Sequence, residues 1–189
     1  MSRNRTAVLL VAGSLLVGAL PATAHAEPAD PLYRLVDTAA QRLATADPVA
    51  ATKWINGGPI TDTTRADQVL DAVGADATGH GVDAGYVRTI FTDQIAATEG
   101  VEYTLFGQWK FAPSTAPTTA PDLADSRTAI DGFNTTMVDE IALQWGLLHG
   151  PACSTELHGA TDAVANARGL DPLYRQALSS ATKSYCALT

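Results

Sequence analysis

Apolar residues recur mostly every three or four positions along the chain, which is the spacing of one face of an α-helix. The longest such run lies in residues 83–111 and contains Val87, Ile90, Phe91, Ile95, Val101, Leu105 and Trp109. No run of alternating β-branched residues predicts a strand. The pattern therefore predicts an all-α, single-domain bundle of about six helices.

Aspartates followed by helix-forming residues mark where these helices begin. Helices are expected at residues 31–55, 62–73, 83–111, 122–150, 153–168 and 171–187, with Asp62 or Thr63, Asp122 and Asp171 as N-caps. Asp47-Pro48 interrupts the first helix, which either kinks there or restarts with Asp47 as its cap. Residues 74–85 and 112–121 are rich in Gly or Pro and are expected to be loops.

The N-terminus has the layout of a secretory signal peptide. Arg3 and Arg5 precede the apolar residues 6–20, and Ala24-His25-Ala26 forms a small-x-small cleavage site. The apolar stretch is too short to cross a bilayer comfortably. We therefore expect residues 1–26 to be cleaved and residues 27–189 to form the exported domain, in a periplasm-like space or outside the cell.

The net negative charge of the chain limits the classes of partner that it is expected to bind. The formal charge is −8, and removal of Arg3 and Arg5, two of the 12 basic residues, with none of the 20 acidic ones would make it −10. Such a field repels nucleic acid and anionic membrane surfaces, so neither is an expected partner of the mature protein. A small anionic ligand would need a local cluster of cations.

The two cysteines, Cys153 and Cys186, would meet an oxidising compartment after export. A pair in that setting usually closes, so we expect one C-terminal disulfide with a structural role, contributing about 2–4 kcal/mol. A metal-binding or nucleophilic role is much less favoured.

Several kinds of catalytic site have no support in the sequence. It contains no G-x-S-x-G elbow, P-loop or G-x-G-x-x-G, and His80, His149 and His158 do not have metal-ligand spacing. Asn134 begins a glycosylation sequon, but the sequon lies inside an expected helix and is interpreted as incidental.

The remaining candidates for a functional site are cationic side chains that lie among apolar residues of the predicted helices. Arg42 and Lys53 are eleven residues apart, so on an unbroken helix they would project within about 20° of one another. Other candidates are Asp62 with Arg65, Thr98 with Glu102, and Arg127. Each alone is typical of a solvated surface, so the residue pattern indicates only an exported helical protein that could hold an anion.

Five segments in order resemble the exported, gamma-type chorismate mutases of the all-helical class. They are LVDTAAQRLATADPVAATKW, PITDTTRADQVL, DQIAATEGVEY with QWK, PDLADSRTAID and LYRQALSSATKSYC, which together span residues 35–186. The resemblance implies an isomerase that rearranges chorismate to prephenate without cofactor, metal or covalent intermediate. Such an enzyme holds a flexible dianion in its reactive conformation and stabilises charge that develops on the ether oxygen.

The resemblance also implies roles for individual residues. Arg42 and Arg127 would each bind a substrate carboxylate, and both come from one chain, so one protomer would carry a complete site. Lys53 would donate to the ether oxygen, with Glu102 on its other side. The remaining ligand contacts would be Arg65, steadied by Asp62, and the hydroxyl of Thr98. Val69 stands where some relatives have a Gln.

Two other functions remain open at this point. An exported helical binding protein could capture an aromatic or carboxylate metabolite without converting it, and a structural or partner-binding bundle would need no cations at these positions. Because members of the resembled family are often dimers, a homodimer is possible as well.

Overall fold

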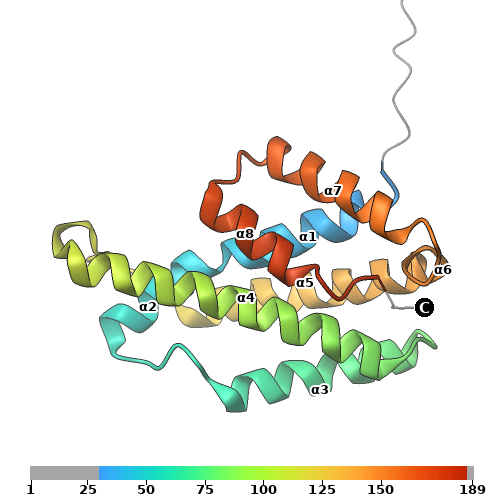
Figure 1. Cartoon of the computed structure of the whole chain (residues 1–189). Coiled ribbons are helices and arrows are strands. Elements are labelled where there is room, and N and C mark those ends of the chain that lie inside the picture. Colours follow the sequence, from blue (N-terminus) through green and yellow to red (C-terminus); the bar gives the residue numbers. More distant parts are fainter. Residues whose placement is uncertain (1–29, 187–189) are drawn as a thin grey trace, which may run out of the picture.

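The computed structural model describes residues 30–186, and the expected signal peptide at residues 1–26 lies outside them (Figure 1). The described chain is helical and contains no strand. Its helices are α1 (Tyr33–Ala44), α2 (Ala46–Asn56), α3 (Thr63–Gly79), α4 (Ala84–Phe111), α5 (Leu123–Leu143), the single turn α6 (Trp145–Leu148), α7 (Cys153–Ala167) and α8 (Pro172–Ala181), with a short 3₁₀ turn at Pro113–Thr115. The expected all-α fold is confirmed.

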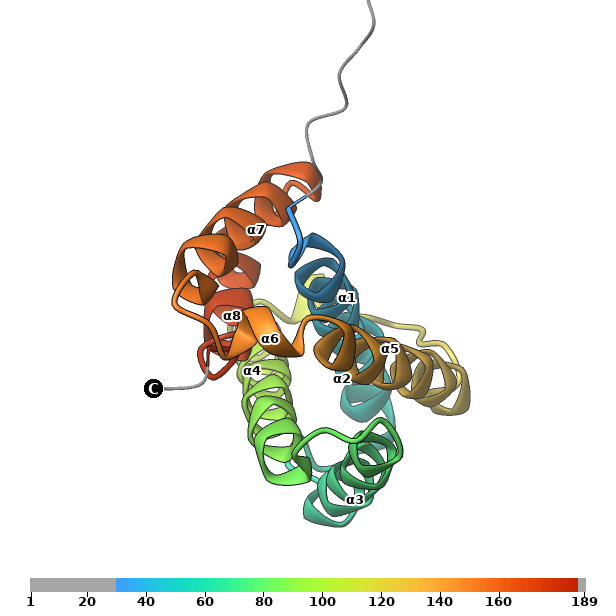
Figure 2. The ribbon, with the colours of Figure 1, turned by 90° about the vertical axis from the view of Figure 1, so that its right-hand side faces the viewer.

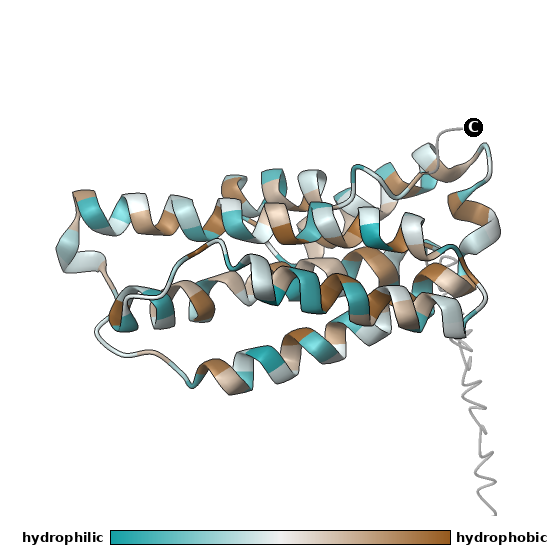
Figure 3. Cartoon of the chain, turned by 90° about the horizontal axis from the view of Figure 1, so that it is seen from below, coloured by the Kyte–Doolittle hydropathy of each residue, from teal (hydrophilic) through white to brown (hydrophobic). Residues whose placement is uncertain are grey.

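The helices pack lengthwise around one core. The long helix α4 contacts α2, α3 and α8, while α1 contacts α5 and α7. Seen end-on in Figure 2, α1, α3, α4 and α5 surround the bundle axis, and α7 with α8 covers the side opposite α3. Figure 3 shows brown and teal segments alternating along each helix, as expected when one face packs inward and the other meets water.

Aspartate caps start four of these helices, three of which the sequence predicted. The side chains of Asp62, Asp83, Asp122 and Asp171 each accept a hydrogen bond from a backbone N–H in the first turn of α3, α4, α5 and α8. Asp62, rather than Thr63, is therefore the cap of α3. Each cap supplies an acceptor for an N–H that has no partner within its own helix.

The break in the first helix is at Thr45, before the expected Asp47-Pro48 position. Pro48 has no N–H to donate to the carbonyl of Ala44, and its ring crowds that carbonyl, so the helical ladder ends there. The prediction that Asp47 caps a new helix is wrong, because Asp47 lies within the first turn of α2 and accepts from Tyr174 Oη at 2.8 Å. Thr45 keeps helical backbone angles.

Three other predicted boundaries are corrected by tertiary packing. Helix α3 continues through residues 74–79, which were expected to form a loop, because Gly74 lies against the Arg88 side chain and Ala77 is fully buried. Helix α5 ends at Leu143 rather than near residue 150, and the turn that follows buries Leu148. Helix α8 ends at Ala181, short of the expected residue 187.

The expected disulfide between Cys153 and Cys186 is present. It joins the first residue of α7 to the segment after α8, where Tyr185 is fully buried. Tyr86 on α4 donates its hydroxyl to the Tyr185 carbonyl, so this segment is fixed to the core on both sides. None of the helices in residues 30–186 is both long and apolar enough to span a membrane.

Candidate active site

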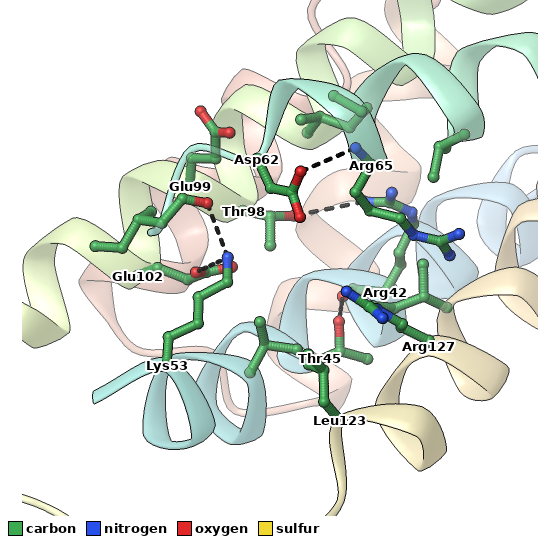
Figure 4. Close-up of a pocket in the computed structure, with 16 residues that line it drawn as sticks. Arg42, Thr45, Lys53, Asp62, Arg65, Thr98, Glu99, Glu102, Leu123 and Arg127 are labelled. Carbon is green, nitrogen blue, oxygen red and sulfur yellow. Dashed lines mark hydrogen bonds and ion pairs between the residues drawn. The ribbon is translucent and has the colours of Figure 1, made fainter. Parts of the chain in front are cut away.

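A pocket of about 700 Å³, including solvent at its mouth, lies where α1, α2, α3, α4 and α5 converge (Figure 4). All seven residues singled out from the sequence line it: Arg42, Lys53, Asp62, Arg65, Thr98, Glu102 and Arg127. Apolar side chains such as Val49, Ile60 and Ile95 complete the wall. The structure therefore brings these residues together from five helices, although the break at Thr45 separates α1 from α2.

Arg42 is the most deeply buried cation of the pocket. The residue is 4% exposed, its Nε donates to Asn134 Oδ1 at 2.7 Å, and one Nη1 hydrogen points at Thr98 Oγ1 at 3.5 Å. Burial lowers the pKa of the guanidinium to about 10 because the charged form loses its hydration. Its hydrogen-bond partners, Asn134 and Thr98, are neutral, and although Arg65 and Asp131 are close enough to influence its charge, no carboxylate among residues 30–186 forms an ion pair with it.

Lys53 and Glu102 form a buried ion pair. Lys53 Nζ donates to Glu102 Oε2 and to the Ile60 carbonyl, both at 2.8 Å. The carboxyl side chain of Glu102 is 4% exposed, and burial raises its pKa above the usual value although the pairing with Lys53 opposes that shift. Since an ammonium has three N–H donors, one remains available to the pocket.

Arg65 is held at the start of α3. The Asp62 side chain accepts from the backbone N–H of Arg65 at 3.0 Å, and the Arg65 guanidinium pairs with Asp131 on α5 at 2.6 Å. This second contact is partly exposed, so solvent weakens it. Asp62 thus shapes the pocket through the backbone of α3 as well as through its charge.

Arg127 is exposed on the first turns of α5 and makes no ion pair with any of the residues 30–186. Of the four cations in the pocket, Lys53 and Arg65 have carboxylate partners, whereas Arg42 and Arg127 have none among residues 30–186. Figure 4 shows the three guanidinium groups together on one side of the pocket and the Lys53–Glu102 pair on the other. The arrangement suits a ligand with two anionic groups at one end and a hydrogen-bond acceptor at the other.

Sequence reasoning missed some polar residues at this site, among them Glu99 and Asn134. Glu99 lines the pocket, and its place four residues after Ile95 and three before Glu102 could have revealed it. Asn134 had no such signal, because its contact with Arg42 joins residues 92 positions apart. The Thr98 hydroxyl donates to the Gln94 carbonyl at 2.8 Å, which leaves its oxygen to accept from Arg42.

The pocket contains no obvious metal-binding set. In residues 30–186, no three His, Cys, Asp or Glu side chains lie close enough together to hold a metal ion. A second pocket, of about 480 Å³ including solvent at its mouth, lies beside the first between α3 and α5 and is lined by residues that include Arg65, Asp131 and Asn134.

Comparison with known proteins gives consistent results. Residues 33–103 match the family described as chorismate mutase type II. The chain is 56% identical over 176 residues to the secreted chorismate mutase of Mycolicibacterium smegmatis, covering 93% of this chain and 97% of that protein. It is 45% identical over 173 residues to the secreted chorismate mutase of Mycobacterium tuberculosis, covering 92% and 87%.

Solved structures agree with the sequence relatives. The crystal structure of chorismate mutase from Burkholderia phymatum superposes with a TM-score of 0.79 at 32% identity, covering 84% of this chain and 98% of that one. The structure from Burkholderia thailandensis has a TM-score of 0.78 at 36% identity, covering 82% and 99%.

Proposed function

This chain belongs to the chorismate mutase family, and from that premise we propose that the pocket between α1, α2, α3, α4 and α5 is its active site. The protein is an exported isomerase that converts chorismate to prephenate.

The rearrangement takes place within one molecule. As the ether C–O bond of the enol-pyruvyl group breaks, a C–C bond forms at the other end of that group, and the electrons move around a six-membered ring. No proton or electron is exchanged with the protein. The enzyme has to hold the dianion in the compact conformation that reacts and to stabilise negative charge growing on the ether oxygen.

The observation that carries the proposal is a pair of guanidinium groups, in one pocket, that form no ion pair within the described part of a chain whose net charge is −8. Arg42 and Arg127 would each bind one carboxylate of chorismate. A hydrogen bond to a charged group is worth about 1.5–3 kcal/mol, and two of them would hold both carboxylates at the same end of the pocket. Arg65, on the same side of the pocket, adds positive potential to the carboxylate-binding end (Figure 4).

Lys53 and Glu102 would lie beside the ether oxygen. Two acceptors orient the Lys53 ammonium, and its remaining N–H would stabilise the developing charge. Because Glu102 contacts Lys53 at 2.8 Å, both groups would lie on the same side of the ether oxygen. An ionised Glu102 there would oppose the developing charge, whereas a protonated Glu102 would donate a second hydrogen bond. Burial already favours the protonated form, and the two negative charges of the substrate would favour it further.

Thr98 and Asp62, the other two predicted residues, would orient the cations that bind the substrate. Thr98 accepts from Arg42 and would help to orient it, in addition to any contact of its hydroxyl with the ligand. Asp62 caps α3 and thereby positions Arg65. A homodimer and cleavage after Ala26 stay predictions.

The test is conversion of chorismate by purified protein beginning at Glu27. We expect chorismate absorbance to fall and a product to form that acid converts to phenylpyruvate. A protein that binds chorismate, seen by calorimetry, but leaves it unconverted would instead be the exported binding protein.

A further inference from the structure

Asn134 on α5 makes the shorter of the two hydrogen bonds of the Arg42 guanidinium. Asn134 is 6% exposed, and its Oδ1 accepts from Arg42 Nε at 2.7 Å. An Nε–H can meet only the oxygen of the amide, so this contact fixes the orientation of the asparagine side chain as well. The hydrogen bond joins α5 to α1, and of the two residues Arg42 lines the pocket.

This contact determines which donors Arg42 presents to a ligand. Of the five N–H donors of a guanidinium, one is used by Asn134 and one points at Thr98, so three outer N–H groups have no partner in residues 30–186. Because Nε and one Nη1 hydrogen are engaged, the donors that remain all belong to the two terminal nitrogens of a residue that lines the pocket. A fork of that kind matches the two oxygens of a carboxylate.

The contact is also neutral, which is unusual for a buried arginine. An aspartate at position 134 could accept the same hydrogen bond but would compensate the charge of Arg42. We propose that Asn134 is a positioning residue whose uncharged amide orients Arg42 while leaving its full charge to attract a substrate carboxylate. This inference rests on the proposed function of the pocket.

The same contact accounts for the sequon at Asn134. The amide that a glycan would need is buried and bonded to Arg42. The contact inside the bundle therefore explains the asparagine at position 134, and the match of Thr136 to the sequon is incidental.

The experiment compares Asn134→Asp with a matched control, Asn166→Asp. Asn166 is exposed on α7 and also accepts from an arginine, Arg175 Nη2, at 3.0 Å, but it does not line the pocket. Both variants add one negative charge beside an arginine without changing side-chain size. Folding is checked by circular dichroism and thermal unfolding, and kcat and KM for chorismate are measured for wild type and both variants.

We expect Asn134→Asp to fold as the wild type does and to raise KM by roughly 10- to 100-fold, since the new charge would lie about 6 Å from a bound carboxylate. The charge opposes the dianion in the ground state and in the transition state alike, so kcat should change less than KM. Asn166→Asp should stay within about twofold of wild type. Equal KM values for the two Asp variants would overturn the inference, while turnover by wild type would keep the proposed function intact.

If Asn134→Asp does not fold, Asn134→Ala is used to test the inference instead. It keeps the charge of Arg42 uncompensated but removes the acceptor that orients it, so we expect kcat/KM to fall at least fivefold. An Ala variant with the kcat/KM of wild type would show that Arg42 needs no positioning by Asn134. Absence of turnover in the wild type itself would instead contradict the proposed function.

Discussion

Replacement of Arg127 by alanine separates ligand binding from folding more cleanly than any other change in the pocket. Arg127 is exposed on α5 and has no ion-pair partner among the described residues, so its truncation leaves no buried group unsatisfied. Surface changes of this kind usually alter the free energy of unfolding by less than about 0.5 kcal/mol. Any large effect on activity would therefore reflect the lost guanidinium.

The size of that effect follows from the proposed contact. Loss of a hydrogen bond between charged groups costs about 1.5–3 kcal/mol, which corresponds to a fall of about 10- to 150-fold in kcat/KM. Arg127→Lys should lie between wild type and Ala, because an ammonium keeps the charge but loses the two-pronged geometry.

Initial rates of chorismate loss, followed by absorbance, give kcat/KM for each variant. Lys110→Ala is the matched control, because Lys110 is exposed near the end of α4, lies outside the pocket and lowers the net charge by the same amount when removed. If Arg127→Ala and Lys110→Ala were both within about twofold of wild type, the role given to Arg127 would be wrong.

Three further predictions follow from other parts of the structure. Because burial raises the pKa of Glu102, activity should decline as the pH rises through that pKa and the proton is lost. Glu102→Gln should keep much of the activity and flatten this decline. If the Gln and Ala variants were equally inactive, the ionised carboxylate would be the form that is needed. Replacing Cys153 and Cys186 by Ser should lower the free energy of unfolding by about 2–4 kcal/mol, measured in urea, while activity at low temperature persists. Asp62→Ala and Asp83→Ala should each cost about 1 kcal/mol of stability through loss of a helix cap, but only Asp62→Ala should also reduce kcat/KM.

Local signals in the sequence were enough to predict where most helices start. An aspartate that accepts a hydrogen bond from the N–H groups just after it acts within one turn, so Asp62, Asp122 and Asp171 could be recognised without any tertiary contact. Helix ends were harder to predict. Gly74 is a helix breaker by propensity, yet α3 continues through it because Arg88 fills the space that a larger side chain would occupy.

The site, like the fold, was predictable from the sequence only in part. The charged residues could be listed from the sequence, and the structure gathers Arg42, Lys53 and Arg127 in one pocket. The ion pairs Lys53–Glu102 and Arg65–Asp131 could not be predicted, since they depend on contacts between helices that are distant in the sequence. Asn134 reads as an incidental sequon in the sequence, and only the packing of α5 against α1 reveals its hydrogen bond to Arg42.

The most direct test of the account is a crystal structure of the mature protein with prephenate bound. We expect one carboxylate of the ligand to lie about 3 Å from the guanidinium of Arg42 and the other about 3 Å from that of Arg127. Lys53 should keep its contact with Glu102 at the opposite end of the pocket. Prephenate bound in the second pocket between α3 and α5, or bound in the first with Arg42 and Arg127 both out of reach, would contradict the account.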